Sequence, residues 1–230
     1  MTKWYLSGSR IKAVVGHYGS GKTEISLNMA LNIRKHYAQT ALADMDIVNP
    51  FFRSAEQQDL LIANGVEPIH SALALSAADI PALPAEFLSV FARPELRCVL
   101  DVGGDDAGAA ALGAYKPQLD ACHAEVYYVV NPFRPRSSTR EQVLEMLAKV
   151  QVRARRAITG FILNANLGAQ TTPEDLLHGR AFLEEISQEC GLPIVAEAGM
   201  ADVLKEVEEK YPQFPICRYL VPEWMECEKK

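Results

Sequence analysis

The sequence contains few cysteines, and their spacing does not suggest a disulfide framework. Five cysteines are spread over 230 residues, without a C-x-x-C pair. An odd number of widely spaced cysteines is typical of reduced thiols in a protein of the cytosol. There is also no H-E-x-x-H motif or histidine cluster, and the sequence therefore gives no indication of a zinc site.

Long apolar runs and an excess of positive charge are also lacking. No apolar stretch approaches the roughly 18 residues that a membrane-spanning helix needs, and the first ten residues lack the apolar stretch of a signal peptide. The formal net charge of −6 argues against a protein that mainly coats nucleic acid or anionic lipid. We therefore expect a cytoplasmic protein, with neither a membrane nor a nucleic acid among its partners.

The composition is that of an ordinary folded domain. Hydrophobic residues make up 49% and charged residues 23% of the chain, close to the averages of globular proteins. A chain of this length buries enough apolar surface for a full core without disulfides or metals. No internal repeat, low-complexity tract or linker divides the sequence. We therefore interpret residues 1–230 as a single domain.

Short apolar runs alternate with longer amphipathic stretches. The apolar runs predict strands at residues 11–15, 40–43, 98–101, 125–130, 157–163 and 192–196. The amphipathic stretches predict helices at residues 22–37, 55–64, 85–91, 107–114, 138–152, 173–190 and 201–210. Apolar strands joined by crossover helices are typical of the α/β class, with a mainly parallel sheet and helices on both faces. In such sheets ligands bind beyond the carboxyl ends of the strands.

The clearest motif follows the first predicted strand. Residues 16–23 match the P-loop, or Walker A, pattern G-x-x-x-x-G-K-[ST] at every fixed position. Glycines permit backbone angles that direct successive N–H groups to phosphate oxygens, and the following helix points its positive end at the same place. The motif therefore predicts a nucleotide-binding loop made of Gly16, His17, Tyr18, Gly19, Ser20, Gly21, Lys22 and Thr23, followed by Glu24.

Within this loop two side chains have distinct predicted roles. The ammonium of Lys22 would reach the β- and γ-phosphates, and the hydroxyl of Thr23 would bind Mg²⁺. Asp101 ends the apolar strand at residues 98–101, which is the place of a Walker B carboxylate, and we expect it to hold Mg²⁺ with Thr23. Asp101 also begins a D-x-x-G pattern, in which the N–H of Gly104 can contact the terminal phosphate.

A second acidic segment, Asp44-Met45-Asp46, ends the strand predicted at residues 40–43. Side chains alternate between the faces of a strand, and only one of the two carboxylates is therefore expected to face the nucleotide. We favour Asp46, the more distal of the two, as the catalytic carboxylate that orients the attacking water. The structural alternative is a turn in which Asp46 pairs with Arg53.

The segment after residue 163 bears on the choice of base. Guanine-reading P-loop proteins carry N/T-K-x-D after a late strand, whereas this chain has Asn164-Ala165-Asn166-Leu167 there. An asparagine amide can pair with N6 and N7 of adenine, as it does in DNA recognition. The sequence therefore favours ATP over GTP, with Asn164 as a nucleotide-binding residue.

Together these motifs resemble the ParA/MinD branch of the SIMIBI-class P-loop NTPases, to which nitrogenase iron protein and cobyrinate-type (CobQ/CobB) domains also belong. The matching pieces span about three quarters of the chain: the loop at 16–23, Asp44-x-Asp46, Asp101-x-x-Gly104 and the strand that ends at Asn164. The resemblance implies an Mg-ATP-binding ATPase that forms a homodimer around two nucleotides. Such proteins act as nucleotide-dependent switches, here for a protein partner that the sequence does not identify.

The sequence departs from this branch at one position. The branch places a signature lysine in K-G-G-x-G-K-[ST], where this chain has His17. A short, mostly neutral imidazole cannot replace an ammonium that reaches across a dimer. Hydrolysis is then slow or activated differently, or another cation substitutes, the candidates being Arg53, Arg134 and Arg136; the plainer alternative is that His17 is only a loop residue.

Other functions remain open on the sequence alone. A small-molecule kinase or an ATP-dependent ligase would use the same loop, with an acceptor pocket formed by Asp105, Asp106, Arg134 and Arg136. A GTPase of the same superfamily and a nucleotide sensor without hydrolytic activity are further alternatives. Hydrolysis that appears only with an added metabolite would distinguish the transferase from the switch.

Overall fold

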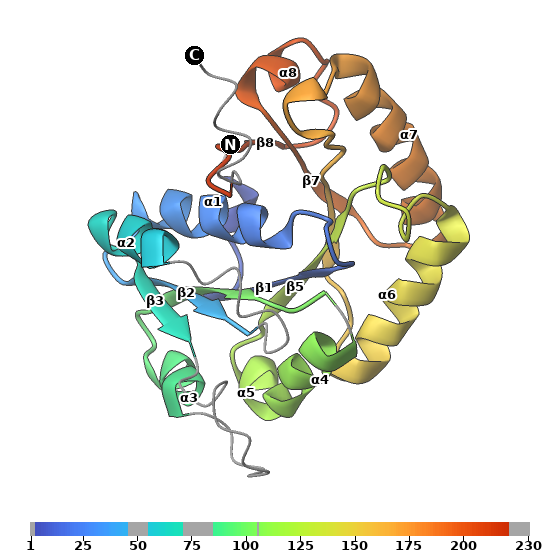
Figure 1. Ribbon diagram of the computed structural model, residues 1–230. Coiled ribbons are helices and arrows are strands. Elements are labelled where there is room, and N and C mark those ends of the chain that lie inside the picture. Colours follow the sequence, from blue (N-terminus) through green and yellow to red (C-terminus); the bar gives the residue numbers. More distant parts are fainter. Residues whose placement is uncertain (1–2, 46–54, 71–84, 105, 221–230) are drawn as a thin grey trace.

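The computed structural model describes residues 3–45, 55–70, 85–104 and 106–220. Eight strands in this part form one sheet (Figure 1): β1 (Ile11–Gly16), β2 (Thr40–Asp44), β3 (Glu67–His70), β4 (Arg97–Asp101), β5 (Glu125–Val130), β6 (Gly160–Leu163), β7 (Ile194–Gly199) and β8 (Gln213–Pro215). Its α-helices are α1 (Lys22–Arg34), α2 (Ala55–Ala63), α3 (Ala85–Ala92), α4 (Asp106–Ala114), α5 (Lys116–Ala121), α6 (Arg140–Ala154), α7 (Pro173–Cys190) and α8 (Ala201–Lys205). Short 3-10 helices lie at η1 (Trp4–Leu6) and η4 (Gly168–Gln170).

All neighbouring strands of the sheet are parallel, in the order β3-β2-β4-β1-β5-β6-β7-β8. β1 lies in the middle, between β4 and β5. The chain passes from β1 to β2 on one side and later crosses from β4 to β5 on the other. The carboxyl end of β1 is therefore a topological switch point, where ligands bind in sheets of this kind.

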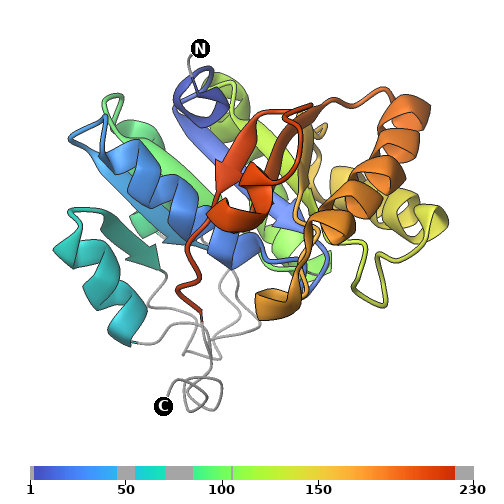
Figure 2. The same ribbon diagram turned by 90° about the horizontal axis from the view of Figure 1, so that it is seen from above.

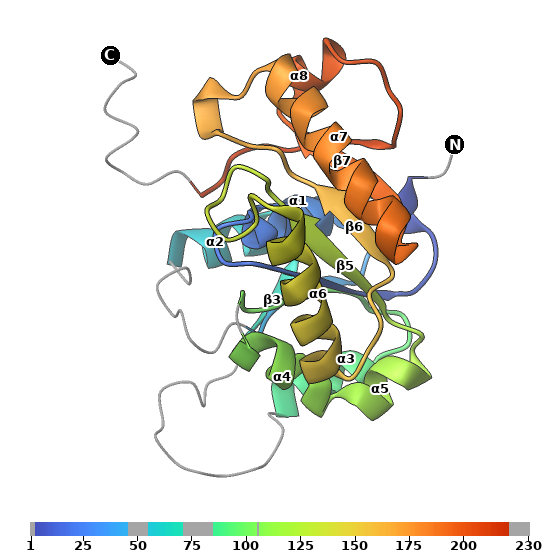
Figure 3. The same ribbon diagram turned by 90° about the vertical axis from the view of Figure 1, so that its right-hand side faces the viewer.

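The central strands are buried on both faces, as their continuous apolar sequences require. In β5, Val126, Tyr128 and Val130 belong to the core beneath α3, α4, α5, α6 and α7. Tyr127 and Val129 belong to the second core, beneath α1 and α2. Figure 1 shows α1 and α2 on one side of the sheet, and Figure 3 shows α6 and α7 side by side over β5 and β6. The predicted α/β class, a mainly parallel sheet with helices on both faces, is confirmed.

The start of α6 corrects one prediction. Thr139 caps this helix, and Gln142 returns a hydrogen bond to it, which completes a capping box. The helix therefore begins at Arg140, two residues after the start that the sequence predicts at residue 138, and neither Ser137 nor Ser138 caps it. The hydroxyl of Ser137 instead donates to the carbonyl of Asn131 over 2.6 Å, within the loop before the helix.

Two helices and one strand are shorter than the sequence pattern predicted. The helix expected to reach residue 37 ends at Arg34, and the one expected over residues 201–210 ends at Lys205. The strand expected from residue 157 begins at Gly160. The N–H of Thr159 still donates to the carbonyl of Val126 over 2.7 Å, but the N–H of Val126 donates to the hydroxyl of Thr159.

The sequence pattern missed the two edge strands, β3 and β8. Each is short and contains a proline, Pro68 in β3 and Pro215 in β8. Proline cannot donate a ladder hydrogen bond and is tolerated where one side of a strand has no partner.

In the described parts of the chain no helix has the length and apolarity needed to cross a membrane.

A buried ion pair joins α7 to β7. The guanidinium of Arg180 donates to both carboxylate oxygens of Glu197, over 2.6 and 2.8 Å, and also to the carbonyl of Glu208. Glu197 is fully buried and Arg180 is 8% exposed. Loss of one partner would leave the other charge buried without compensation.

We expect Arg180→Met to lower the free energy of unfolding by roughly 3–5 kcal/mol, since Glu197 then remains as an unpaired buried carboxylate. Lys210→Met is the matched control, because Lys210 pairs with Glu184 of the same helix, α7, but is 55% exposed; its loss should be much smaller than that of Arg180→Met, since solvent screens the exposed pair. Urea denaturation measures both, and equal losses in the two variants would contradict the assignment.

Candidate nucleotide-binding site

The segment between β1 and α1 folds into a tight loop at the switch point of the sheet. Gly16, Gly19 and Gly21 have φ angles of 146°, 76° and 92°, which favour glycine. The N–H of Ser20 donates to the carbonyl of His17 over 3.1 Å and closes the loop. A Cβ on Gly16 would lie 2.5 Å from the carbonyl oxygen of Val129. The loop therefore packs directly on the end of β5, and a side chain at residue 16 would prevent this.

Lys22, the first residue of α1, is folded back over the loop. Its Nζ donates to the carbonyl of His17 over 3.1 Å, and the residue is only 7% exposed. His17 is also buried, and its Nδ1 carries the proton that is donated to the carbonyl of Tyr18 over 2.9 Å, since a carbonyl can only accept. The His17 side chain is therefore bonded within its own loop, whereas Tyr18 is 58% exposed.

Asp101 lies at the end of β4, beside the first turn of α1. It is 6% exposed, and its carboxylate accepts hydrogen bonds from Ser26, over 3.1 Å, and from Thr23. Burial raises its pKa to about 7. The ammonium of Lys22 and the two hydroxyls oppose this rise in pKa, and the charge of Asp44 adds to it. The structure thus brings Lys22, Thr23 and Asp101 together.

Asp44 is a residue of this site that the sequence reasoning set aside. It is the last residue of β2 and lies opposite Asp101 in the register of β2 with β4, and its charge acts on the pKa of Asp101. The sequence shows that both aspartates end apolar strands, but only the structure shows that these strands are neighbours in the sheet. Asp46, the carboxylate preferred on the sequence, lies outside the described residues, as does Arg53.

Gly104 packs directly on the phosphate loop from the β4 side. A Cβ at this position would lie 2.7 Å from Nζ of Lys22 and 2.7 Å from the backbone nitrogen of Tyr18. Real Cβ contacts are never this short without a shift of the neighbouring backbone. The D-x-x-G segment thus places the Gly104 backbone against the loop, as the motif requires.

Asn164 joins the end of β6 to the other side of the loop. Its Nδ2 donates to the carbonyl of Ser20 over 2.7 Å, which fixes the orientation of the amide, because a carbonyl cannot donate. Its Oδ1 and the hydroxyl of Ser20 are buried and have no hydrogen-bond partner among the described residues. Buried polar atoms without a partner are rare in folded proteins. Two such atoms lie at this loop.

Glu24 is engaged by the segment that follows β8. Its carboxylate accepts hydrogen bonds from the backbone N–H groups of Tyr219 and Leu220, over 2.7 and 3.1 Å. Asn28, one turn along α1, exchanges two hydrogen bonds with the backbone of Cys217. Burial raises the pKa of Glu24, and the two N–H groups oppose this rise. Figure 2 shows this segment, in red, beside the beginning of α1.

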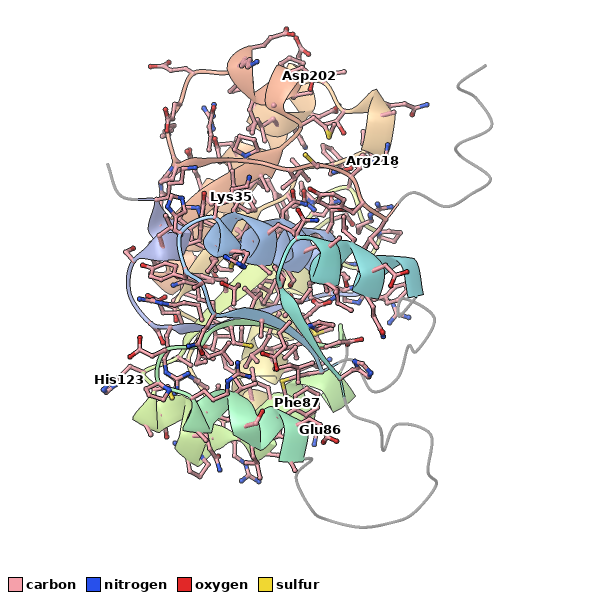
Figure 4. The ribbon with its side chains drawn as sticks, turned by 90° about the vertical axis from the view of Figure 1, so that its left-hand side faces the viewer. Lys35, Glu86, Phe87, His123, Asp202 and Arg218 are labelled. Carbon is pink, nitrogen blue, oxygen red and sulfur yellow. The ribbon has the colours of Figure 1, made fainter. Side chains whose placement is uncertain are left out.

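This contact places the segment after β8 at the carboxyl edge of the sheet. Arg218 approaches the loop after β6, with one guanidinium nitrogen 3.9 Å from the place of a Cβ on Gly168. Figure 4 shows Arg218 and His123 toward opposite ends of the molecule. The sequence carries no local signal for the contact, because its partners lie almost 200 residues apart.

A cleft of about 690 Å³ opens at that opposite end, where β1, β4 and β5 begin. Its lining includes Arg10, Glu125 and His123. The guanidinium of Arg10 already donates to carbonyls at the end of α3, and Glu125 forms an ion pair with Lys12. These charged groups are engaged in holding the sheet, and we assign no chemistry to this cleft.

The raised pKa of Asp101 has a measurable consequence for stability. In the folded protein the carboxyl group holds its proton to about pH 7, whereas in the unfolded chain it ionises near pH 4. Its contribution to stability is therefore complete below about pH 4 and is lost as the pH rises through about 7. Asp101→Asn keeps an acceptor for Ser26 but cannot ionise.

Without nucleotide or Mg²⁺, we expect the unfolding free energy of Asp101→Asn to gain roughly 2–3 kcal/mol relative to the natural protein between about pH 5 and pH 8. Urea denaturation at several pH values measures this difference. A difference that does not change with pH would show that Asp101 ionises normally in the folded protein.

Comparisons of the structure with solved structures identify the fold. FtsY, a cell division protein of Thermotoga maritima, is similar with a TM-score of 0.55 and 21% identity, over 84% of this chain and 62% of that chain. A nucleotide-binding protein of Archaeoglobus fulgidus in complex with ADP has a TM-score of 0.51 and 17% identity, over 88% of this chain and 86% of that chain.

The signal recognition particle 54 kDa protein of Aeropyrum pernix, in complex with GDP, has a TM-score of 0.50 and 19% identity, over 80% of this chain and 40% of that chain. The chain thus spans less than two thirds of the FtsY and signal recognition particle proteins. No protein-family model and no curated protein sequence matches the chain. At these identities the similarity concerns the fold alone: the chain has the α/β fold of the P-loop NTPases.

Proposed function

We propose that this protein binds Mg-ATP at residues 16–23 and hydrolyses it, acting as a dimeric switch of the ParA/MinD type. One observation carries the proposal: the glycine-rich loop, the Lys22 ammonium and the Gly104 backbone meet at the switch point of the sheet. Backbone N–H groups and one ammonium around a small space suit an oxygen-rich anion. A triphosphate would replace the carbonyl of His17 as the partner of Lys22.

The residues beside the loop suit a magnesium ion. Mg²⁺ prefers oxygen ligands and usually takes one or two side chains together with phosphates and waters. The hydroxyl of Thr23 and the carboxylate of Asp101 are such oxygens, and they already lie within hydrogen-bond distance of each other. When bound, the ion would neutralise charge on the phosphates. Lys22 would stabilise the charge that develops on the transferred phosphoryl group.

The attacking water needs a carboxylate or another acceptor to orient it. We propose Asp46 for this role, as the sequence suggests. Asp44 is the second candidate, because its charge lies close enough to Asp101 to raise the pKa of that carboxyl group. A homodimer around two nucleotides would leave Tyr18, which is 58% exposed, at the surface between the two loops.

The amide of Asn164 supports adenine as the base. Its Oδ1 is a buried acceptor without a partner among the described residues, and the amino group at N6 of adenine is a donor. Guanine presents an oxygen at the same position, which would face Oδ1 acceptor to acceptor. GTP remains the second candidate, because the similar signal recognition particle protein holds GDP, whereas the similar Archaeoglobus protein holds ADP.

Isothermal titration with Mg-ATP, Mg-ADP and Mg-GTP tests the site. We expect Lys22→Ala to weaken triphosphate binding by at least about tenfold, since it removes a charge-assisted hydrogen bond. Lys35→Ala is the control, because Lys35 follows the other end of the same helix and is exposed. Sedimentation in each nucleotide state tests dimer formation. Equal affinity in Lys22→Ala and Lys35→Ala would contradict the proposal.

The base assignment predicts that Asn164→Ala reduces the preference for ATP over GTP. The variant loses the acceptor for N6, and the ratio of the two dissociation constants should move toward one by a factor of about five to twenty. Asn166→Ala is the control, because its Oδ1 is already occupied by the N–H of Gly168. An unchanged ratio in Asn164→Ala would show that the base is selected elsewhere.

A further inference from the structure

The phosphate loop has one cationic side chain of its own, Lys22, although a triphosphate carries several negative charges. In the proposed family the second cation stands where this chain has His17. The side chain of His17 is buried, and its Nδ1 donates to the carbonyl of Tyr18 within its own loop. Another element at the carboxyl edge of the sheet can supply a second cationic side chain, in addition to the proposed Mg²⁺.

Arg134 lies over the outer side of the loop. Its Cδ and Nε are each 3.9 Å from the place where a Cβ on Gly19 would be, which is ordinary van der Waals contact. A larger residue with a bulky side chain at position 19 would compete with the arginine for this space. The glycine at position 19, which also has a positive φ, thus leaves room for the stem of the arginine.

The backbone around Arg134 is held firmly. Its N–H donates to the carbonyl of Asn131 over 3.2 Å, and its carbonyl accepts from the N–H of Ser137 over 2.9 Å. Asn131 and Ser137 are almost fully buried, and the amide of Asn131 also donates to the carbonyl of Asn166 over 3.0 Å. Pro132 and Pro135 flank the arginine and restrict the backbone further.

The guanidinium, in contrast, is not engaged by any residue that the structure describes. Arg134 is exposed, and in the described residues its side chain has neither a carboxylate nor a carbonyl partner. Most other arginines near the core are bonded, such as Arg10, Arg156 and Arg180. A rigid backbone that presents an unpaired guanidinium beside a phosphate loop is the arrangement expected of a phosphate ligand, since the planar fork of arginine matches phosphate oxygens.

We propose that Arg134 supplies, from the same chain, the second cationic contact to the bound polyphosphate that the loop lacks at position 17. This inference rests on the proposed function, because it assumes that the loop binds a nucleotide. It differs from the cross-dimer lysine of the resembled branch in one respect: the monomer already carries both cations.

The test compares four variants by isothermal titration with Mg-ATP and with inorganic tripolyphosphate, at concentrations where the protein sediments as a monomer. Arg134→Met keeps the apolar stem over Gly19 and removes the charge, whereas Arg134→Lys keeps a charge without the fork. Arg140→Ala is the control, because Arg140 is exposed at the start of α6 and its guanidinium already pairs with Glu189. Arg134→Ala removes both stem and charge, and thermal unfolding confirms that each variant is folded.

We expect Arg134→Met and Arg134→Ala to weaken the binding of both ligands by about tenfold or more, Arg134→Lys to recover part of the loss, and Arg140→Ala to stay within about twofold. Unchanged affinity in Arg134→Met would overturn the inference, because packing alone would then explain the contact. A loss for ATP but not for tripolyphosphate would also overturn it, since Arg134 would act on the base or ribose.

The failure of this inference differs from that of the proposed function. If the natural protein binds neither ligand, or if Lys22→Ala binds as the natural protein does, the nucleotide site itself is wrong and the inference falls with it. If the natural protein binds both ligands, Lys22→Ala does not, and Arg134→Met is unchanged, then the role of Arg134 alone is refuted.

Discussion

The site depends on the close approach of bare backbone to its neighbours at the carboxyl end of β1. Gly16 meets the carbonyl of Val129, Gly21 meets the amide of Asn164, and Gly104 meets Lys22 and the backbone of Tyr18. Each of these positions would collide if it carried a Cβ. The loop is thus shaped by close contacts with residues at the ends of β4, β5 and β6, which only bare backbone permits.

The second constraint is electrostatic. Asp101 and Asp44 end neighbouring strands, and burial disfavours the ionised form of Asp101 unless a positive charge compensates it. Without a ligand this compensation comes from Lys22 and from the Thr23 and Ser26 hydroxyls. A divalent cation would take over part of this role and free Lys22 for phosphate. The same groups therefore serve the stability of the free protein and the binding of its proposed ligand.

The sequence predicted the fold well wherever its pattern was long and periodic. The strand at residues 125–130 and the helix at residues 173–190 have the predicted bounds, because the first is continuously apolar and the second begins at a capping box with Pro173 and ends at Gly191. The edge strands β3 and β8 were missed because strands of three or four residues with a proline leave no period to detect.

The candidate site was predicted in part, for similar reasons. The Walker A motif identified the phosphate loop, and the ends of apolar strands identified Asp101 and Asn164 as candidate site residues. Three further features depend on tertiary packing. They are the position of Asp44 opposite Asp101, the contact of Glu24 with the backbone of residues 219 and 220, and the position of Arg134 beside Gly19. Sequence spacing does not contain such contacts between distant segments.

The central claim is that an anion nests on the backbone amides between Val15 and Glu24. The most direct measurement follows the amide resonances of the labelled protein during titration with Mg-ATP. The account predicts the largest shifts at residues 18–23, together with Gly104, and saturation at one nucleotide per chain. Saturable binding that leaves these amides unchanged and shifts residues at another edge of the sheet would contradict it.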